Sequence, residues 1–132
     1  MSSSTLSAAP VLEPTAELVS FAERQVRYAR LYRGDERRSE LRRLMVIPAL
    51  VQPVDGEYKA IGSPICGVTR DISPQGIGLF HSEPLNHNLL AIQITLVGEQ
   101  INIITEKLWC RIYGPFYSIG GKFITKTDEF PS

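Results

Sequence analysis

The feature that most constrains this 132-residue chain is a succession of short apolar runs, each closed by a turn signal, that begins at Leu44. In residues 90–96 an apolar side chain stands at every second position, which is the period of a strand with one buried face. Asp55-Gly56 and Gly114-Pro115 are typical of turns. We therefore predict an all-β body in which five or six short antiparallel strands close a small barrel. The expected strands are 44–51, 65–72, 76–80, 90–96, 101–111 and 117–125.

Two local features add detail to this prediction. Pro48 lies inside the first run, so that run should form an edge strand or carry a bulge. Ahead of the barrel, residues 14–34 read as an amphipathic helix that Thr15 caps and Gly34 ends. We expect its apolar stripe to pack on the barrel, although such a stripe could also bind a partner or a membrane surface. The stripe consists of Leu18, Phe21, Ala22, Tyr28, Ala29 and Tyr32.

The composition limits the classes of protein to which this chain can belong. The first 13 residues are rich in Ser, Ala and Pro and should form a disordered tail. They lack the order of a signal peptide, and no apolar run is long enough to span a membrane, so we expect a soluble cytoplasmic protein. Net charge is zero, so attraction to an anion must be local. The two cysteines and two histidines match no familiar zinc-ligand spacing, and we expect reduced, partly buried thiols, no metal and no cofactor.

Charge is concentrated in one window. Eight of the ten arginines lie in residues 24–43, where the acids number only three. Four of these arginines fall within residues 37–43, immediately ahead of the first apolar run. Guanidinium groups pair in bidentate fashion with phosphate and with the edge of guanine. The cluster therefore indicates a phosphate or nucleotide clamp, while a solvated helix face with i,i+4 ion pairs is the alternative.

A second polar segment follows the expected strand 65–72. Residues 71–76 read Asp-Ile-Ser-Pro-Gln-Gly and form a turn that presents a carboxylate, a hydroxyl and backbone N–H groups at one rim. A carboxylate accepts hydrogen bonds from the amino and imino edge of guanine, and a glycine lets a ligand approach the backbone. Alternatively, the Asp and Ser side chains simply bond their own turn.

Together the two segments resemble the two-part signature of the PilZ domain family, an Arg-x-x-x-Arg that ends at Arg42 and an Asp-x-Ser-x-x-Gly that runs from Asp71 to Gly76. The resemblance covers about residues 37–125. It includes Pro48, Leu108-Trp109 and the segment 118–123. It implies a six-stranded split barrel, here residues 35–128 with the arginine-rich loop, and a receptor for cyclic di-GMP.

The resemblance also implies the binding residues and the partners. The expected ligand contacts are Arg37, Arg38, Arg42, Asp71, Ser73 and Gly76, with Trp109 as a further candidate that could equally belong to the core. We expect a non-enzymatic monomer or dimer that passes the signal to an unnamed protein. An adaptor that binds no nucleotide is the alternative. The sequence contains no pattern of nucleophile and base that would support a hydrolase. A barrel that binds nucleic acid would need a basic sheet face with several exposed aromatic side chains.

Overall fold

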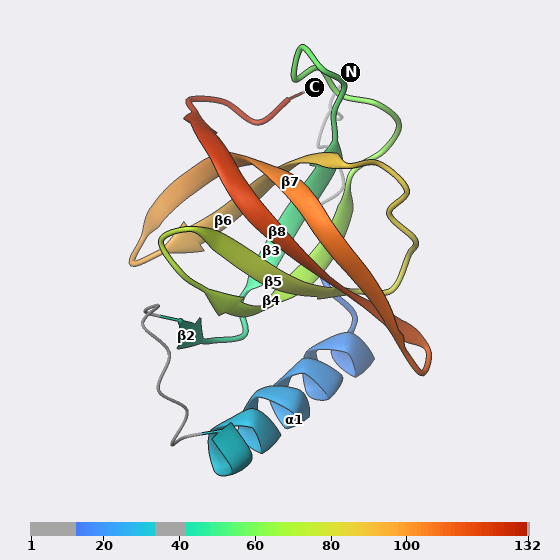
Figure 1. Cartoon of the computed structure of the whole chain (residues 1–132), viewed down its shortest axis with the longest axis vertical. Helices are drawn as coiled ribbons and strands as arrows, with labels where there is room; N and C mark the ends of the chain where they lie inside the picture. The colour runs from blue at the N-terminus through green and yellow to red at the C-terminus, as the bar shows by residue number, and fades with distance from the viewer. Residues whose placement is uncertain (1–12, 34–41, 132) are drawn as a thin grey trace, which may run out of the picture.

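The computed structural model describes residues 13–33 and 42–131 and contains, within them, one helix and one seven-stranded sheet (Figure 1). The strands run in the order β2-β4-β3-β6-β7-β8-β5, and a further pairing of β4 with β5 closes six of them into an antiparallel barrel. Strand β2 is the additional one and lies along β4. The predicted six-stranded barrel with an N-terminal helix is therefore confirmed. The elements are α1 (Ala16–Arg33), β2 (Arg43–Leu44), β3 (Pro48–Pro53), β4 (Ile65–Ile72), β5 (Gly76–His81), β6 (Leu89–Leu96), β7 (Glu99–Tyr113) and β8 (Phe116–Thr127).

Side chains at alternate positions along the strands fill the barrel interior. Leu90, Ile92 and Ile94 of β6 are buried there, as their spacing predicts. Strand β3 lies between β4 and β6 and is therefore central, so of the two alternatives expected from Pro48 the edge strand is wrong. The run 44–51 is instead interrupted ahead of Pro48, because residues 45–47 separate β2 from β3 along β4. The proline is accommodated because it stands at the first residue of the strand.

Two irregularities in strand pairing matter for the site. Between β4 and β5 the register shifts after Thr69, so that Arg70 is an extra residue before Asp71 pairs with Gly78. Between β7 and β8 a similar shift leaves Leu108 as an extra residue. Such bulges redirect side chains that strict alternation would point elsewhere. Both bulges lie beside the groove described below.

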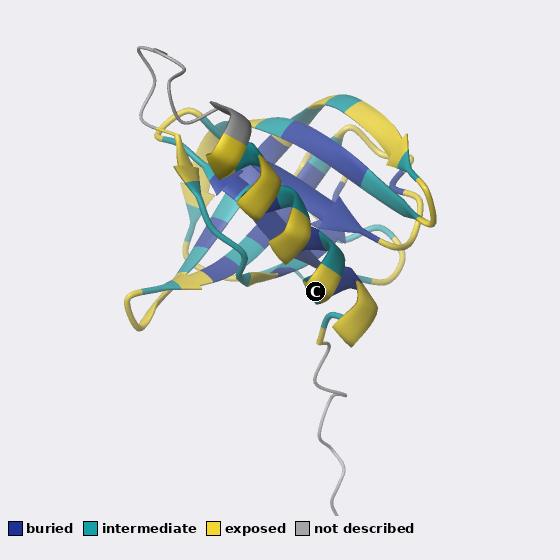
Figure 2. Ribbon diagram, turned by 90° about the horizontal axis from the view of Figure 1, so that it is seen from below, coloured by how far each residue is buried: buried dark blue, intermediate teal, exposed yellow. Residues whose placement is uncertain are grey.

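Helix α1 crosses the outer surface of the barrel with its exposed residues facing away from it (Figure 2). Leu18 and Ala22 are buried in a cluster with Val68 and Phe80, and the N–H of Leu18 donates to the Thr15 hydroxyl at 3.2 Å, which confirms the predicted cap. The expected packing of the helix on the barrel is therefore correct, with one correction within the described side chains, which do not include that of Tyr32. Tyr28 is 63% exposed, and the buried residue at the next turn is Val26.

Some of the remaining expectations concern residues that the structure describes, and others concern residues that it does not. The disordered tail, the helix end at Gly34 and the placement of Arg37 and Arg38 lie outside the described residues. In the described part, no helix has the length and apolarity needed to cross a membrane. Both cysteines are free. Cys66 is half-buried as expected, whereas Cys110 is exposed.

Candidate functional site

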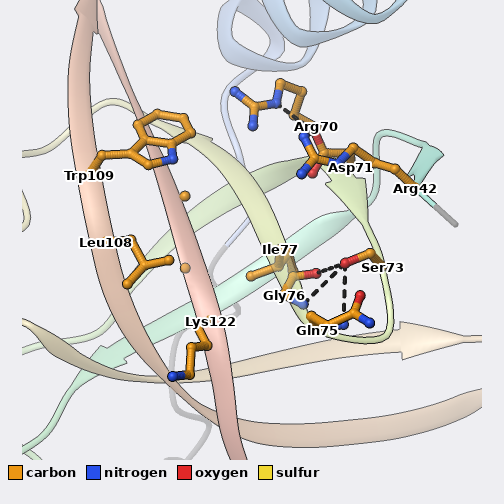
Figure 3. A pocket seen from close by; sticks show the side chains of 12 residues that line it. Arg42, Arg70, Asp71, Ser73, Gln75, Gly76, Ile77, Leu108, Trp109 and Lys122 are labelled. Carbon is orange, nitrogen blue, oxygen red and sulfur yellow. Dashed lines mark hydrogen bonds and ion pairs between the residues drawn. The ribbon is translucent and has the colours of Figure 1, made fainter. Parts of the chain in front are cut away.

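A groove of about 250 Å³ opens on the outer face of the barrel, where the β4–β5 turn faces β7 and β8 (Figure 3). Asp71, Ser73 and Gln75 lie on one side of it, and Trp109 and Lys122 lie on the other. Its walls therefore combine a carboxylate, cations and an aromatic ring. The full lining consists of Arg42, Arg70, Asp71, Ser73, Gln75, Gly76, Ile77, Leu108, Trp109, Gly120, Gly121 and Lys122.

Strand β2 brings the end of the arginine-rich segment to the acidic turn. Leu44 pairs with Asp71 across the β2–β4 ladder, so Arg42 emerges beside the same carboxylate. The Arg42 guanidinium lies 3.9 Å from Asp71 Oδ2, and Asp71 is only 6% exposed. Residues 42 and 71, which belong to the two separate sequence motifs, therefore meet at one groove.

Arg70 is a site residue that the sequence reasoning missed. Strict alternation along a strand points neighbouring side chains to opposite faces, and on that argument Arg70 would face away from Asp71. The bulge at Arg70 changes the direction of its side chain. As a result, the Arg70 Nε donates to Asp71 Oδ2 at 2.9 Å. The Arg70 guanidinium also lies over the Trp109 ring, 5.2 Å from its centroid. Both Arg70 and Asp71 consequently line the groove.

The turn itself is stabilised by Ser73. The Ser73 hydroxyl accepts the N–H groups of Gln75 at 3.3 Å and Gly76 at 3.2 Å, and the Ser73 N–H donates to the Gly76 carbonyl at 2.9 Å. These are the local bonds of a serine turn. Packing also favours glycine at position 76, since a Cβ at this position would collide with the Gly121 carbonyl.

The opposite wall is built around Trp109. Its indole lies directly over Gly120, where a Cβ would overlap the ring. Arg111 lies over the same ring at 5.0 Å but does not line the groove. Trp109 is thus a half-buried wall residue of the groove on the outside of the barrel.

Comparison with known proteins bears on the fold. No protein-family model and no curated protein matches the chain. Among solved structures, an inhibitor of motility from Bacillus subtilis (MotI/DgrA) aligns at a TM-score of 0.56 and 18% identity, over 70% of this chain and 45% of that one. This chain therefore spans less than half the length of that inhibitor. The PilZ domain of CeSA from a cellulose-synthesizing bacterium aligns at 22% identity and a TM-score of 0.46, over 64% of this chain and 81% of that domain.

The chain has a PilZ-type fold. At these identities the likeness concerns the fold and not the residues of the groove. The PilZ-type barrel brings together the five described residues that the sequence singled out. These are Arg42, Asp71, Ser73, Gly76 and Trp109.

The groove also contains residues that the sequence did not single out as ligand contacts. Gln75 lay inside the recognised turn, and Lys122 lay inside the recognised closing segment, so their positions could have suggested them. Leu108 lay inside the recognised Leu108-Trp109 pair, whereas Arg70 reaches the groove through a bulge, for which the sequence carries no comparable signal. Arg37 and Arg38 remain predictions.

Proposed function

We propose that this domain binds cyclic di-GMP in the groove and passes the signal to a protein partner. The observation that carries the proposal is the meeting of Arg42 and Asp71, the nearest ends of two distant motifs, at the mouth of one groove. Phosphate needs cations and guanine needs a fixed acceptor for its N–H groups. Arg42 supplies the cation and Asp71 supplies the acceptor, and their charged groups lie 3.9 Å apart.

The remaining walls fit the same ligand. Trp109 offers an aromatic plane for a purine, and Lys122 offers a further cation for phosphate. Contact of the Ser73 hydroxyl with the ligand would require exchange of its turn hydrogen bonds. A groove of about 250 Å³ is smaller than the usual small-molecule site, so it suits one guanine with its phosphate. The remaining phosphate contacts would come from Arg37 and Arg38, as the motif predicts.

An adaptor that binds no nucleotide is the second candidate. Two observations favour it, because Asp71 already meets two guanidinium groups and the Ser73 hydroxyl is already bonded within its turn. Such a pattern would also suit a motif that only stabilises the barrel. The two functions differ in whether the groove takes up a ligand.

Calorimetric titration of the whole chain separates them. Cyclic di-GMP should bind, and cyclic di-AMP should bind poorly, because adenine presents a different set of donors and acceptors. Arg42→Ala and Asp71→Asn should each weaken binding by about 10- to 100-fold, the effect of losing one charge-assisted hydrogen bond. Arg24→Ala and Asp128→Ala are matched controls, because both side chains are exposed away from the groove, and they should bind as the parent protein does. A parent protein that takes up neither dinucleotide would point to the adaptor.

A further inference from the structure

Arg70 is held from several directions at once. Its Nε donates to Asp71 Oδ2 at 2.9 Å, and its Nη1 donates to the Ser118 hydroxyl of β8 at 3.2 Å. The guanidinium also lies over the rings of Trp109 and Phe80, 5.2 and 5.9 Å from their centroids. Only 21% of the Arg70 side chain is exposed. A surface arginine normally samples many rotamers, whereas this one has a defined position.

The backbone beneath Arg70 is shaped to receive it. Gly78 and Gly120 are directly opposite each other across the β5–β8 ladder. A Cβ at Gly78 would lie 2.5 Å from Arg70 Nη2, and a Cβ at Gly120 would collide with the Trp109 indole. The two glycines therefore leave space for a guanidinium and an indole to lie on the sheet, one beside the other.

This arrangement holds the Asp71 carboxylate, the hydrogen-bond acceptor of the groove, in one orientation. A carboxylate that is free to rotate accepts hydrogen bonds from many donors, but a carboxylate held through one oxygen presents the rest of the group in a defined direction. The Arg70 Nε holds the Asp71 carboxylate through Oδ2, while Ser118 keeps Arg70 in place. Lysine could supply the charge but not the planar fork.

We propose that Arg70 is the positioning residue that sets the preference of this groove for guanine over adenine, acting through Asp71 and Trp109. The inference rests on the proposed function. Guanine offers adjacent N–H donors to a carboxylate, whereas adenine offers one amino donor beside an acceptor. Only a correctly oriented Asp71 carboxylate therefore distinguishes the two bases.

The test compares the dissociation constants for cyclic di-GMP and cyclic di-AMP, and their ratio, in whole-chain variants. Arg70→Lys keeps the charge and should weaken cyclic di-GMP binding by about 10-fold or more, with a smaller loss for cyclic di-AMP, so that the ratio falls. Ser118→Ala should act in the same direction, although Ser118 is fully buried and does not line the groove. The double variant should bind about as weakly as Arg70→Lys alone, because the two residues act as one unit.

Arg111→Lys is the matched control. Arg111 lies as close to the Trp109 ring as Arg70 does, but outside the groove, so this variant should keep both the affinity and the ratio. Thermal unfolding of each variant checks that it is folded, and Ser118→Ala still decides the question if Arg70→Lys is not.

The outcomes separate the two proposals. If the parent protein binds neither dinucleotide, the proposed function fails. If the parent protein binds cyclic di-GMP and both Arg70→Lys and Ser118→Ala keep its affinity and its ratio, the inference about Arg70 is overturned while the function stands. An equal loss for both ligands would also overturn it, because Arg70 would then contribute charge without base preference.

Discussion

His81 shows how one side chain can make the stability of this domain depend on pH. The residue is fully buried on β5, its ring stacks on Tyr117 at 5.5 Å, and its Nδ1 lies 2.6 Å from the Glu83 carbonyl. Nε2 is buried and has no hydrogen-bond partner among the described residues. Burial lowers the pKa of His81 below its ordinary value near 6.5, the Glu83 carbonyl opposes this shift, and the Lys107 ammonium adds to it.

The sign of the pH effect follows from this shift. Because the pKa is lower in the folded state than in the unfolded state, the unfolded chain binds the proton more readily, and stability falls as pH falls through the unfolded value. We predict that urea unfolding between pH 7.5 and pH 5.5 shows this loss, at most about 1.4 kcal/mol per pH unit for one group. His81→Phe, which keeps a planar ring beside Tyr117, should flatten the slope.

His87 provides the control for this experiment. It is the only other histidine in the chain, and it is exposed. His87→Gln should keep the slope of the parent protein. If His81→Phe kept that slope as well, the acid sensitivity would belong to other groups.

At the scale of elements, the pairing of β5 with β8 joins the turn of the groove to its opposite wall. Gly76 pairs with Lys122, and the Gly121 carbonyl occupies the space that a Cβ at residue 76 would need. We predict that Gly76→Ala destabilises the protein by about 1–3 kcal/mol in the absence of any ligand, as overpacking does. Chemical unfolding measures the change.

Gly56→Ala is the matched control for the turn glycine. Nothing lies within 4 Å of a Cβ placed at Gly56, so this substitution should change the free energy of unfolding by no more than about 0.5 kcal/mol. A Gly76→Ala protein as stable as the parent would show that the strands can separate there without cost, and that Gly76 matters only for a ligand.

The same elements show which parts of the site the sequence could predict. The 71–76 turn was predictable because Asp, Ser and Gly act through local backbone chemistry. The bulge at Arg70 was not, because it depends on how β4 pairs with β5. The central position of β3 was missed for a related reason, since Pro48 is harmless at the first residue of a strand.

At the scale of the whole molecule, the helix and the groove are connected through β2. Arg30 of α1 donates from Nη2 to the Leu44 carbonyl at 2.8 Å, and Leu44 pairs with Asp71. A ligand that binds between Arg42 and Asp71 would therefore stabilise β2, and β2 would in turn hold the Arg30 side chain. The amino-terminal half of α1 is already fixed on the barrel by Leu18 and Ala22.

We predict that this connection appears in hydrogen exchange. Cyclic di-GMP should slow exchange in residues 43–44 and 71–76 and, more weakly, in the last turn of α1, with no change near Leu18. Arg30→Ala should remove the effect on the helix and keep the effect on the turn, whereas Arg27→Ala, an exposed neighbour, should keep both. Identical helix protection in the parent and Arg30→Ala proteins would contradict the connection.

The helix also shows why periodicity alone did not place every residue. Its spacing predicted a stripe through Tyr28, but the side chain that is buried at this level is Val26, and Tyr28 is largely exposed. Which apolar residues of the helix become buried depends on the opposing surface, and that surface is formed by strands distant in the sequence.

Trp109 is the only tryptophan in the chain, and it lies in the wall of the groove with a guanidinium on its ring. Nearly all indole fluorescence of this protein therefore originates at the one place where a ligand would arrive. A purine stacked on that ring would quench the emission, whereas a molecule bound elsewhere on the barrel would leave it unchanged. The protein thus carries its own optical reporter of groove occupancy, which would allow libraries of nucleotides to be screened without any label.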